Sequence, residues 1–184
     1  MKAIITVIAT ILLSFSVNAW SATEGIDQVV LLDVQGFRGG TNLWISGDGR
    51  AVSSFVRPAQ KVGTGLQETR YSFRLTREQN AALAELLKRI DFFSIGTADR
   101  YGVPDEPRPA VFIKAGGRTH AVANWANDRH ERFDLIYTFL IKAAQSGRKG
   151  AEIKKAAFDR NWKPEGFPEN KTIIGMTQPQ PDRK

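Results

Sequence analysis

The stretch Asn124–Asp134, NWANDRHERFD, places one of the chain's two histidines among three carboxylates. His130 and Asp134 are four residues apart, so on a helix they would share one face. That spacing suits two metal ligands, or a general base and the carboxylate that orients it. His120 would join the pair if its strand faced that helix. One hypothesis is therefore a hydrolase or metal-dependent enzyme that uses His130, Asp134 and His120.

The same residues also suit the first turn of a helix. Asp128 and Glu131 have the spacing of a capping box, and acidic residues at this end of a helix face the positive end of its dipole. Arg129 and Arg132 flank the candidate pair and would repel a cation. The helix interpretation is therefore favoured, and neither a metal nor a cofactor is expected.

Other patterns of catalytic residues are absent from the sequence. There is no cysteine and no Gly-x-Ser-x-Gly elbow for a nucleophile. The glycines of Gln35–Gly40 match neither the dinucleotide fingerprint nor the phosphate loop. Asp99, Asp105 and Glu106 lack the spacing of a calcium loop. The sequence therefore favours a non-catalytic protein.

The N-terminus has the pattern of a signal peptide. Lys2 precedes an uncharged, mostly apolar run over residues 3–17, and compact residues precede a cleavage site after Ala19. The run is shorter than the roughly 20 residues that span a bilayer as a helix. We therefore expect residues 1–19 to direct export to the periplasm or the medium. Retention of the segment as an anchor is the alternative.

The mature chain is expected to lack any membrane attachment of its own. No later segment is apolar enough to span a bilayer, and without a cysteine the chain cannot be a lipoprotein. The net charge is +7, and residues 146–184 hold nine Lys and Arg against five Asp and Glu. Aromatic residues are not interleaved with this charge, so no nucleic-acid partner is expected. Weak attraction to anionic surfaces gives a further hypothesis, a structural envelope-associated protein.

The first half of the mature chain is predicted to form strands. Residues 29–34 are apolar except for Asp33, and Asp48-Gly49 suits a tight hairpin turn. Residues 68–75 alternate polar and apolar side chains with a period of two, as in a strand with one buried face.

The second half is predicted to contain helices and a hairpin. Thr76-Arg77-Glu78-Gln79 reads as a capping box that opens a helix over 77–90. A hairpin follows over 110–125, with a Gly-Gly turn, and a second helix ends near Ser146-Gly147. The order ββββ-α-ββ-α predicts an α+β domain over residues 20–146, with an antiparallel sheet of about six strands and two helices packed on one face. Residues 147–184 are predicted to form a flexible basic tail, with a short helix at 150–160.

Candidate contact residues come from one long loop and from two tryptophans. The stretch Gly96–Pro109 is long for a loop in a small domain, and such loops often carry recognition. An exposed tryptophan would mark a contact patch, whereas a buried one would belong to the core. The predicted binding residues are Arg100, Tyr101, Asp105, Glu106, Arg108, Trp44 and Trp125.

Three segments resemble one family: VVLLDVQGFRGG, LTREQNAALAELLKRIDFF and PAVFIKAGGRTHAVANW. With the final amphipathic helix, they resemble the emfourins, small protein inhibitors of protealysin-type, thermolysin-like metalloproteases. The resemblance covers about residues 27–144, and the chain differs by its signal peptide, by extra length between the second and fourth strands and by its basic tail. It implies a binding domain rather than an enzyme, with another envelope or secreted protein as partner, and it assigns no inhibitory residues.

Overall fold

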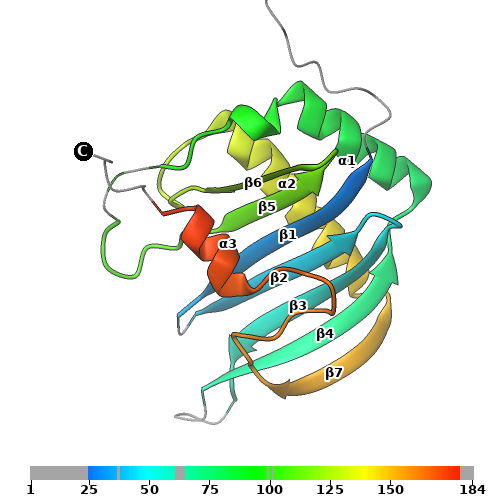
Figure 1. Ribbon diagram of the computed structural model, residues 1–184. Helices are drawn as coiled ribbons and strands as arrows, with labels where there is room; N and C mark the ends of the chain where they lie inside the picture. The colour runs from blue at the N-terminus through cyan, green and yellow to red at the C-terminus, as the bar shows by residue number, and fades with distance from the viewer. Residues whose placement is uncertain (1–24, 37, 61–64, 99, 101, 179–184) are drawn as a thin grey trace, which may run out of the picture.

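The apolar run Val29–Leu32 lies in strand β1 (Ile26–Gln35), inside a seven-stranded antiparallel sheet. The computed structural model describes residues 25–36, 38–60, 65–98, 100 and 102–178, and the predicted signal peptide lies outside them. The strands are ordered β6-β5-β1-β2-β3-β4-β7 across the sheet (Figure 1). The other strands are β2 (Gly39–Ser46), β3 (Arg50–Pro58), β4 (Leu66–Arg74), β5 (Ala110–Ala115), β6 (Arg118–Ala123) and β7 (Ala151–Ala157).

Strand β1 is buried on both of its faces. Successive side chains of a strand point to opposite sides of the sheet. Val29 and Leu31 belong to the core cluster that includes the two long helices, whereas Val30 and Leu32 belong to a second cluster on the other side. The unbroken apolar run therefore reflects a central strand covered by one layer on each face.

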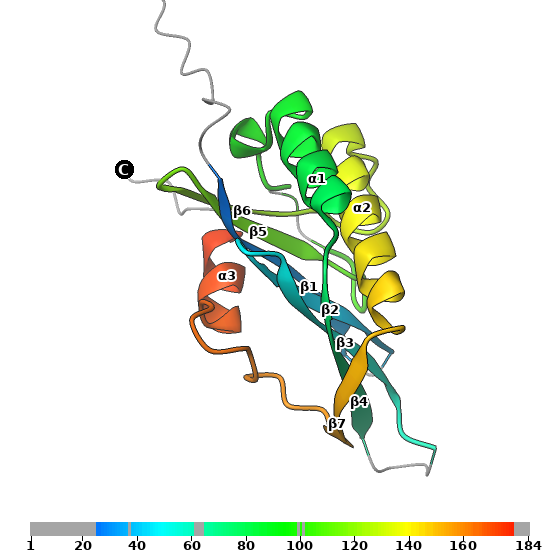
Figure 2. The same ribbon diagram turned by 90° about the vertical axis from the view of Figure 1, so that its right-hand side faces the viewer.

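The first layer consists of α1 (Arg77–Arg89), the short 3-10 helix η1 (Phe92–Ser94) and α2 (Glu131–Gly147). Figure 2 shows α1 and α2 side by side on one face of the sheet. The capping box predicted at Thr76 and Gln79 is present, so the start of α1 is confirmed. Helix α2 begins after His130 rather than after Asp128, so the capping box predicted at Asp128 is wrong. None of the described helices is long and apolar enough to cross a membrane.

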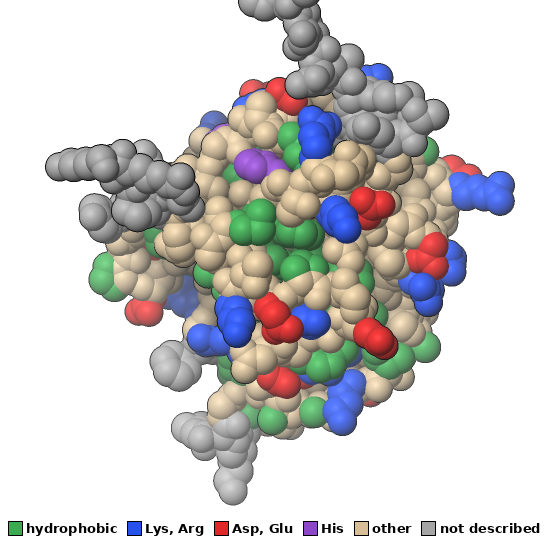
Figure 3. Space-filling view, in the orientation of Figure 1, with side chains coloured by type: hydrophobic (Ala, Val, Ile, Leu, Met, Phe, Trp, Pro, Cys, Tyr) green, Lys and Arg blue, Asp and Glu red, His purple; other side chains and the backbone are tan. Residues whose placement is uncertain are grey.

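The second layer covers the opposite face and comes from the C-terminal segment. Helix α3 (Asn170–Met176) places Ile173 in the second core cluster, against which Trp162 and Phe167 pack. Hydrophobic side chains gather near the centre of this face (Figure 3). The expectation of an α+β fold on an antiparallel sheet is confirmed. The two predicted helices, α1 and α2, share one face as expected, and α3 adds a third helix on the other face.

A buried ion pair lies under this second layer. Glu68 and Arg70 of β4 bond to each other through both carboxylate oxygens, and Ser54 donates to Glu68 at 3.0 Å. The Arg70 guanidinium lies 3.5 Å from the ring centre of Trp162. Because a buried charge is costly without partners, this cluster requires Trp162 and its segment to stay in place over the sheet.

Strand β7 lies where a flexible tail and a short helix were predicted. It pairs antiparallel with β4 and completes the sheet edge. Six of its seven side chains are exposed, so the sequence of Ala151–Ala157 shows no hydrophobic alternation from which a strand could be predicted. Backbone hydrogen bonds to β4 hold the strand in place, and Lys154 and Lys155 keep the new edge charged, which discourages further pairing. The predictions of a tail at 151–157 and 170–176, of six strands and of two helices are therefore wrong.

The packing of α3 can be tested with two neighbouring isoleucines. Ile173 is fully buried and Ile174 is 46% exposed. We expect Ile173→Ala to lower the free energy of unfolding by about 2–4 kcal/mol, because it empties a packed site. Ile174→Ala should change it by less than about 0.5 kcal/mol, as surface substitutions do. Chemical denaturation of the two variants measures the difference, and equal values would show that α3 does not pack on the sheet.

Candidate functional site

His130 and Asp134 lie together, but both serve the start of α2. The Phe133 N–H donates to His130 Nδ1 at 3.2 Å, and the His130 N–H donates to an Asp134 carboxylate oxygen at 3.3 Å. The two side chains therefore satisfy backbone donors that the first helical turn leaves without partners. A histidine acting as N-cap explains the spacing that suggested a base and its orienting carboxylate.

His120 lies apart from this pair, on β6. Its Nε2 bonds the carbonyl of Ile95 at 2.8 Å, and its ring stands edge-on to Phe92, with centres 5.5 Å apart. Among the described residues, no group of three or more His, Cys, Asp or Glu side chains is placed to hold a metal ion. The histidines therefore have structural partners, and they do not form a common site.

The loop over residues 95–109, between η1 and β5, is tied to the end of β6 along both of its arms. In the first arm, the Ala98 N–H donates to the carbonyl of Ala123 at 3.3 Å. In the second arm, the Ala126 N–H donates to the carbonyl of Pro107 at 2.9 Å. These backbone hydrogen bonds hold both arms of the loop beside the end of β6, so they fix where the middle of the loop begins and ends.

One carboxylate organises the middle of the loop. Arg100 donates from Nη1 and Nη2 to the two oxygens of Glu106, at 3.0 and 2.7 Å, and from Nε to Asp128 at 2.8 Å. The same Glu106 carboxylate accepts the backbone N–H groups of Val103 and Asn127, each at 3.3 Å. Paired, charge-assisted bonds of this kind are among the strongest in proteins. The hydrogen bonds from Arg100 lower the pKa of Glu106 to about 2.

Trp125 packs against the loop and bonds to its backbone. Its Nε1 donates to the carbonyl of Arg100 at 3.2 Å, and the guanidinium groups of Arg100 and Arg108 lie 5.3 and 5.1 Å from the centre of its ring. Gly102 lies directly against this ring, because a Cβ at position 102 would come within 2.2 Å of it. The close approach requires glycine at this position, and any side chain there would displace Trp125.

The tip of the loop is a tight turn that presents an apolar side chain. The Glu106 N–H donates to the carbonyl of Val103 at 3.2 Å across Pro104 and Asp105. Proline at the second position and a φ of 62° at Asp105 are features of a type II β-turn. Val103 is 58% exposed at the start of this turn. The loop thus holds a hydrophobic group in solvent on a support of hydrogen bonds.

The structure brings together five of the predicted binding residues: Arg100, Asp105, Glu106, Arg108 and Trp125. Tyr101 lies outside the described residues. Trp44 is buried and stands edge-on to Trp162 at 5.2 Å, so its assignment to a contact surface is wrong and it belongs to the core.

Gly102 and Val103, which shape and occupy the tip, were not among the predicted binding residues. Trp125 was also predicted to lie within a strand, whereas β6 ends at Ala123. The sequence Val103-Pro104-Asp105 carried a usable signal, since proline followed by aspartate is typical of the central positions of a turn.

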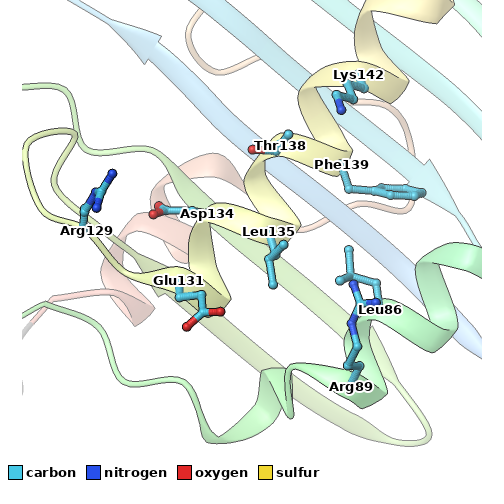
Figure 4. Close-up of a pocket in the computed structure, with 9 residues that line it drawn as sticks. All are labelled: Leu86, Arg89, Arg129, Glu131, Asp134, Leu135, Thr138, Phe139 and Lys142. Carbon is cyan, nitrogen blue, oxygen red and sulfur yellow. The ribbon is translucent and has the colours of Figure 1, made fainter.

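A groove of about 640 Å³ lies between α1 and α2. Figure 4 shows Leu86 on α1 and Leu135 and Phe139 on α2 projecting between the two helices. Charged side chains of both signs line its walls: Arg89, Arg129, Glu131, Asp134 and Lys142. Because the charges are mixed, the groove indicates no particular class of ligand.

A cavity of about 320 Å³ lies between the end of β1, the loop and α2. In its wall, the Tyr137 hydroxyl donates to Asp33 at 2.8 Å. Burial raises the pKa of both groups above their ordinary values. The bond fastens α2 to β1 beside the loop, and it leaves the Tyr137 hydroxyl already engaged.

Comparison of the chain with protein-family models, with curated proteins and with solved structures found no match. The resemblance to the emfourins therefore stays a prediction.

The capping role of His130 can be tested by two substitutions. We expect His130→Ala to lower the free energy of unfolding by about 1 kcal/mol, the usual cost of losing an N-cap acceptor. His130→Asn should lose less, because asparagine is a good N-cap residue. Denaturant titration measures both values. Equal losses in the two variants would contradict the capping role.

The Glu106 carboxylate predicts an acid-sensitive loop. Its pKa of about 2 lies below the ordinary 4.5, so an open loop binds the proton more tightly than the closed one does. The stabilisation is therefore complete above pH 4.5 and is lost as the pH falls toward 2. Carbon-13 NMR should find Glu106 titrating near pH 2 in the native protein and nearer 4.5 in Arg100→Gln. A native value near 4.5 would contradict the pairing.

Proposed function

We propose that this chain is an exported, non-catalytic protein-binding domain that contacts its partner through the loop tip, residues 103–105. The proposal rests on the hydrogen bonds that shape the loop in the absence of a partner. Glu106, Arg100 and Trp125 fix its shape while Val103 stays exposed. A loop that serves only to connect two elements has no need of such an arrangement.

A fixed loop reduces the cost of association. Ordering a flexible segment on binding consumes interaction energy, and a segment held in its bound shape avoids that loss. An apolar side chain at the centre of a contact, surrounded by polar groups, is a common arrangement at protein interfaces. Val103 would supply the apolar centre. Asp105 and the ion pair of Arg100 with Glu106 would lie around it.

The sequence supports the compartment and the kind of partner in this proposal. The signal-peptide pattern of residues 1–19 supports export, which makes another envelope or secreted protein the partner. The resemblance to the emfourins adds a secreted thermolysin-like metalloprotease as the specific expectation. The capping roles of His130 and Asp134 give no support to the alternative of an enzyme.

The proposal is tested by capture of exported proteins on the purified protein, followed by affinity measurement with the captured partner. Val103→Asp should weaken binding at least tenfold, because it places a charge at the apolar centre of the contact. The matched control is Ile153→Asp, which changes a similarly exposed apolar residue (49%) on β7. Ile153→Asp should leave the affinity unchanged.

Two outcomes would contradict the proposal. One is a folded protein that captures no exported protein. The other is equal affinity of the Val103→Asp and Ile153→Asp variants for the partner. For a captured metalloprotease, inhibition of peptide hydrolysis should follow the same ranking of variants.

The need for a fixed loop shape makes a separate prediction. Gly102→Ala should reduce the affinity without removing any contact group, because its Cβ would displace Trp125. Gly96→Ala is the control in the same loop, since its Cβ would meet no atom within 4 Å. Calorimetric titration against the partner measures both affinities. Equal affinities would show that the shape of the loop does not matter for binding.

A further inference from the structure

We infer that the cavity between α3 and the sheet, called here the α3 cavity, binds a small amphipathic carboxylate with a hydrogen-bond donor at its far end. The cavity has a volume of about 410 Å³, within the roughly 300–1,000 Å³ range of small-molecule sites. Its described lining comes from the end of β1, from β2, from the start of β5 with Arg108 before it, from Trp125 and from the C-terminal segment. This inference goes beyond the proposed function, and its test requires no protein partner.

The charges that line the cavity have one sign. Arg108 and Arg160 are the charged residues in its described lining, which includes no carboxylate. Within the described part of the chain, neither arginine forms an ion pair. Among the described residues, the α3 cavity therefore presents positive charge without a counterion, and an anion would offset it.

Arg108 is the more strongly constrained of the two. Its Nη2 donates to the carbonyls of Ala98 and Thr177, at 3.2 and 2.8 Å, while its buried Nε has no partner. Burial lowers its pKa. Its described partners, the two carbonyls and the Trp125 ring, are all uncharged, so none of them neutralises its charge. A carboxylate in the cavity would correct that imbalance.

Asn170 supplies a second unsatisfied group at the other end of α3. Its Nδ2 donates to the carbonyls of Arg160 and Trp162, at 2.9 and 3.2 Å, which fixes the orientation of the amide. Asn170 lines the cavity and is only 7% exposed. Its buried Oδ1 accepts no hydrogen bond. Buried acceptors are nearly always satisfied, so this one points to a ligand with a donor.

The positions of these groups set the length of the ligand. Thr177, whose carbonyl bonds Arg108, follows Asn170 by seven residues. Seven residues of helix advance about 10 Å. The cavity wall also includes the apolar side chains of Leu32, Val34 and Ile174. The ligand therefore carries a carboxylate and a donor about two helical turns apart, joined by an apolar chain.

Three probes of equal chain length separate these requirements. The first is 8-hydroxyoctanoate, which has the carboxylate, the apolar chain and the terminal donor. Octanoate lacks the donor, and 1,8-octanediol lacks the charge. We expect 8-hydroxyoctanoate to bind with one-to-one stoichiometry by calorimetry, octanoate to bind more weakly and the diol to bind undetectably. Added salt should weaken binding of both carboxylates, since the attraction is partly electrostatic.

Two variants with matched controls place the probe in the α3 cavity. Arg160→Gln should weaken 8-hydroxyoctanoate binding roughly fivefold, as expected for a solvent-exposed charge, whereas Arg77→Gln on α1 should not. Ile174→Asp, which puts a negative charge in the cavity wall, should abolish binding. Met176→Asp is its control, because Met176 is also exposed on α3 but does not line the cavity.

The inference would be overturned by any of three results from folded protein. These are no binding of either carboxylate at millimolar concentration, equal binding of the diol and the carboxylates, and binding that Ile174→Asp leaves unchanged. Thermal unfolding of each variant confirms that the loss does not come from a failure to fold.

Discussion

The structure depends on the burial of β1 on both of its faces. A strand with four consecutive apolar side chains, Val29–Leu32, cannot leave either face in water without exposing two of them. The chain meets this requirement with two separate layers. Helices α1 and α2 cover one face, and the segment from Trp162 to α3 covers the other. Both the loop and the α3 cavity lie where these layers meet the end of the sheet.

The two candidate sites share residues at that end. Trp125 supports the loop through Arg100 and also lines the α3 cavity. Arg108 stacks on the same ring and bonds the last turn of α3. The loop therefore rests on groups that the C-terminal layer helps to hold. This layer belongs to the folded unit because its side chains complete the core and the Thr177 carbonyl accepts a hydrogen bond from the partly buried Arg108.

The parts of the fold that were predictable from sequence are those with a local signal. The capping box at Thr76 and the glycine turns gave α1 and the hairpins nearly at their observed bounds. Strand β7 has no apolar periodicity, and α3 is short with one large buried apolar side chain, Ile173, so their sequences resemble a tail. The continuous apolar run in β1 fits a strand covered on both faces, but no second layer was predicted from it. The position of the loop was predictable from sequence. The hydrogen bonds from Arg100 in the loop to Asp128, which follows β6 in the chain, were not.

The binding function proposed for the loop requires that the loop hold its shape without a partner, and nitrogen-15 relaxation of the free protein tests this most directly. We predict order parameters of about 0.85 for the amides of Val103 and Glu106, equal to those of the sheet. Values below about 0.6 at these amides, beside a rigid sheet, would contradict the claim. The loop would then be a flexible connection, and the binding function assigned to its tip would lose its basis.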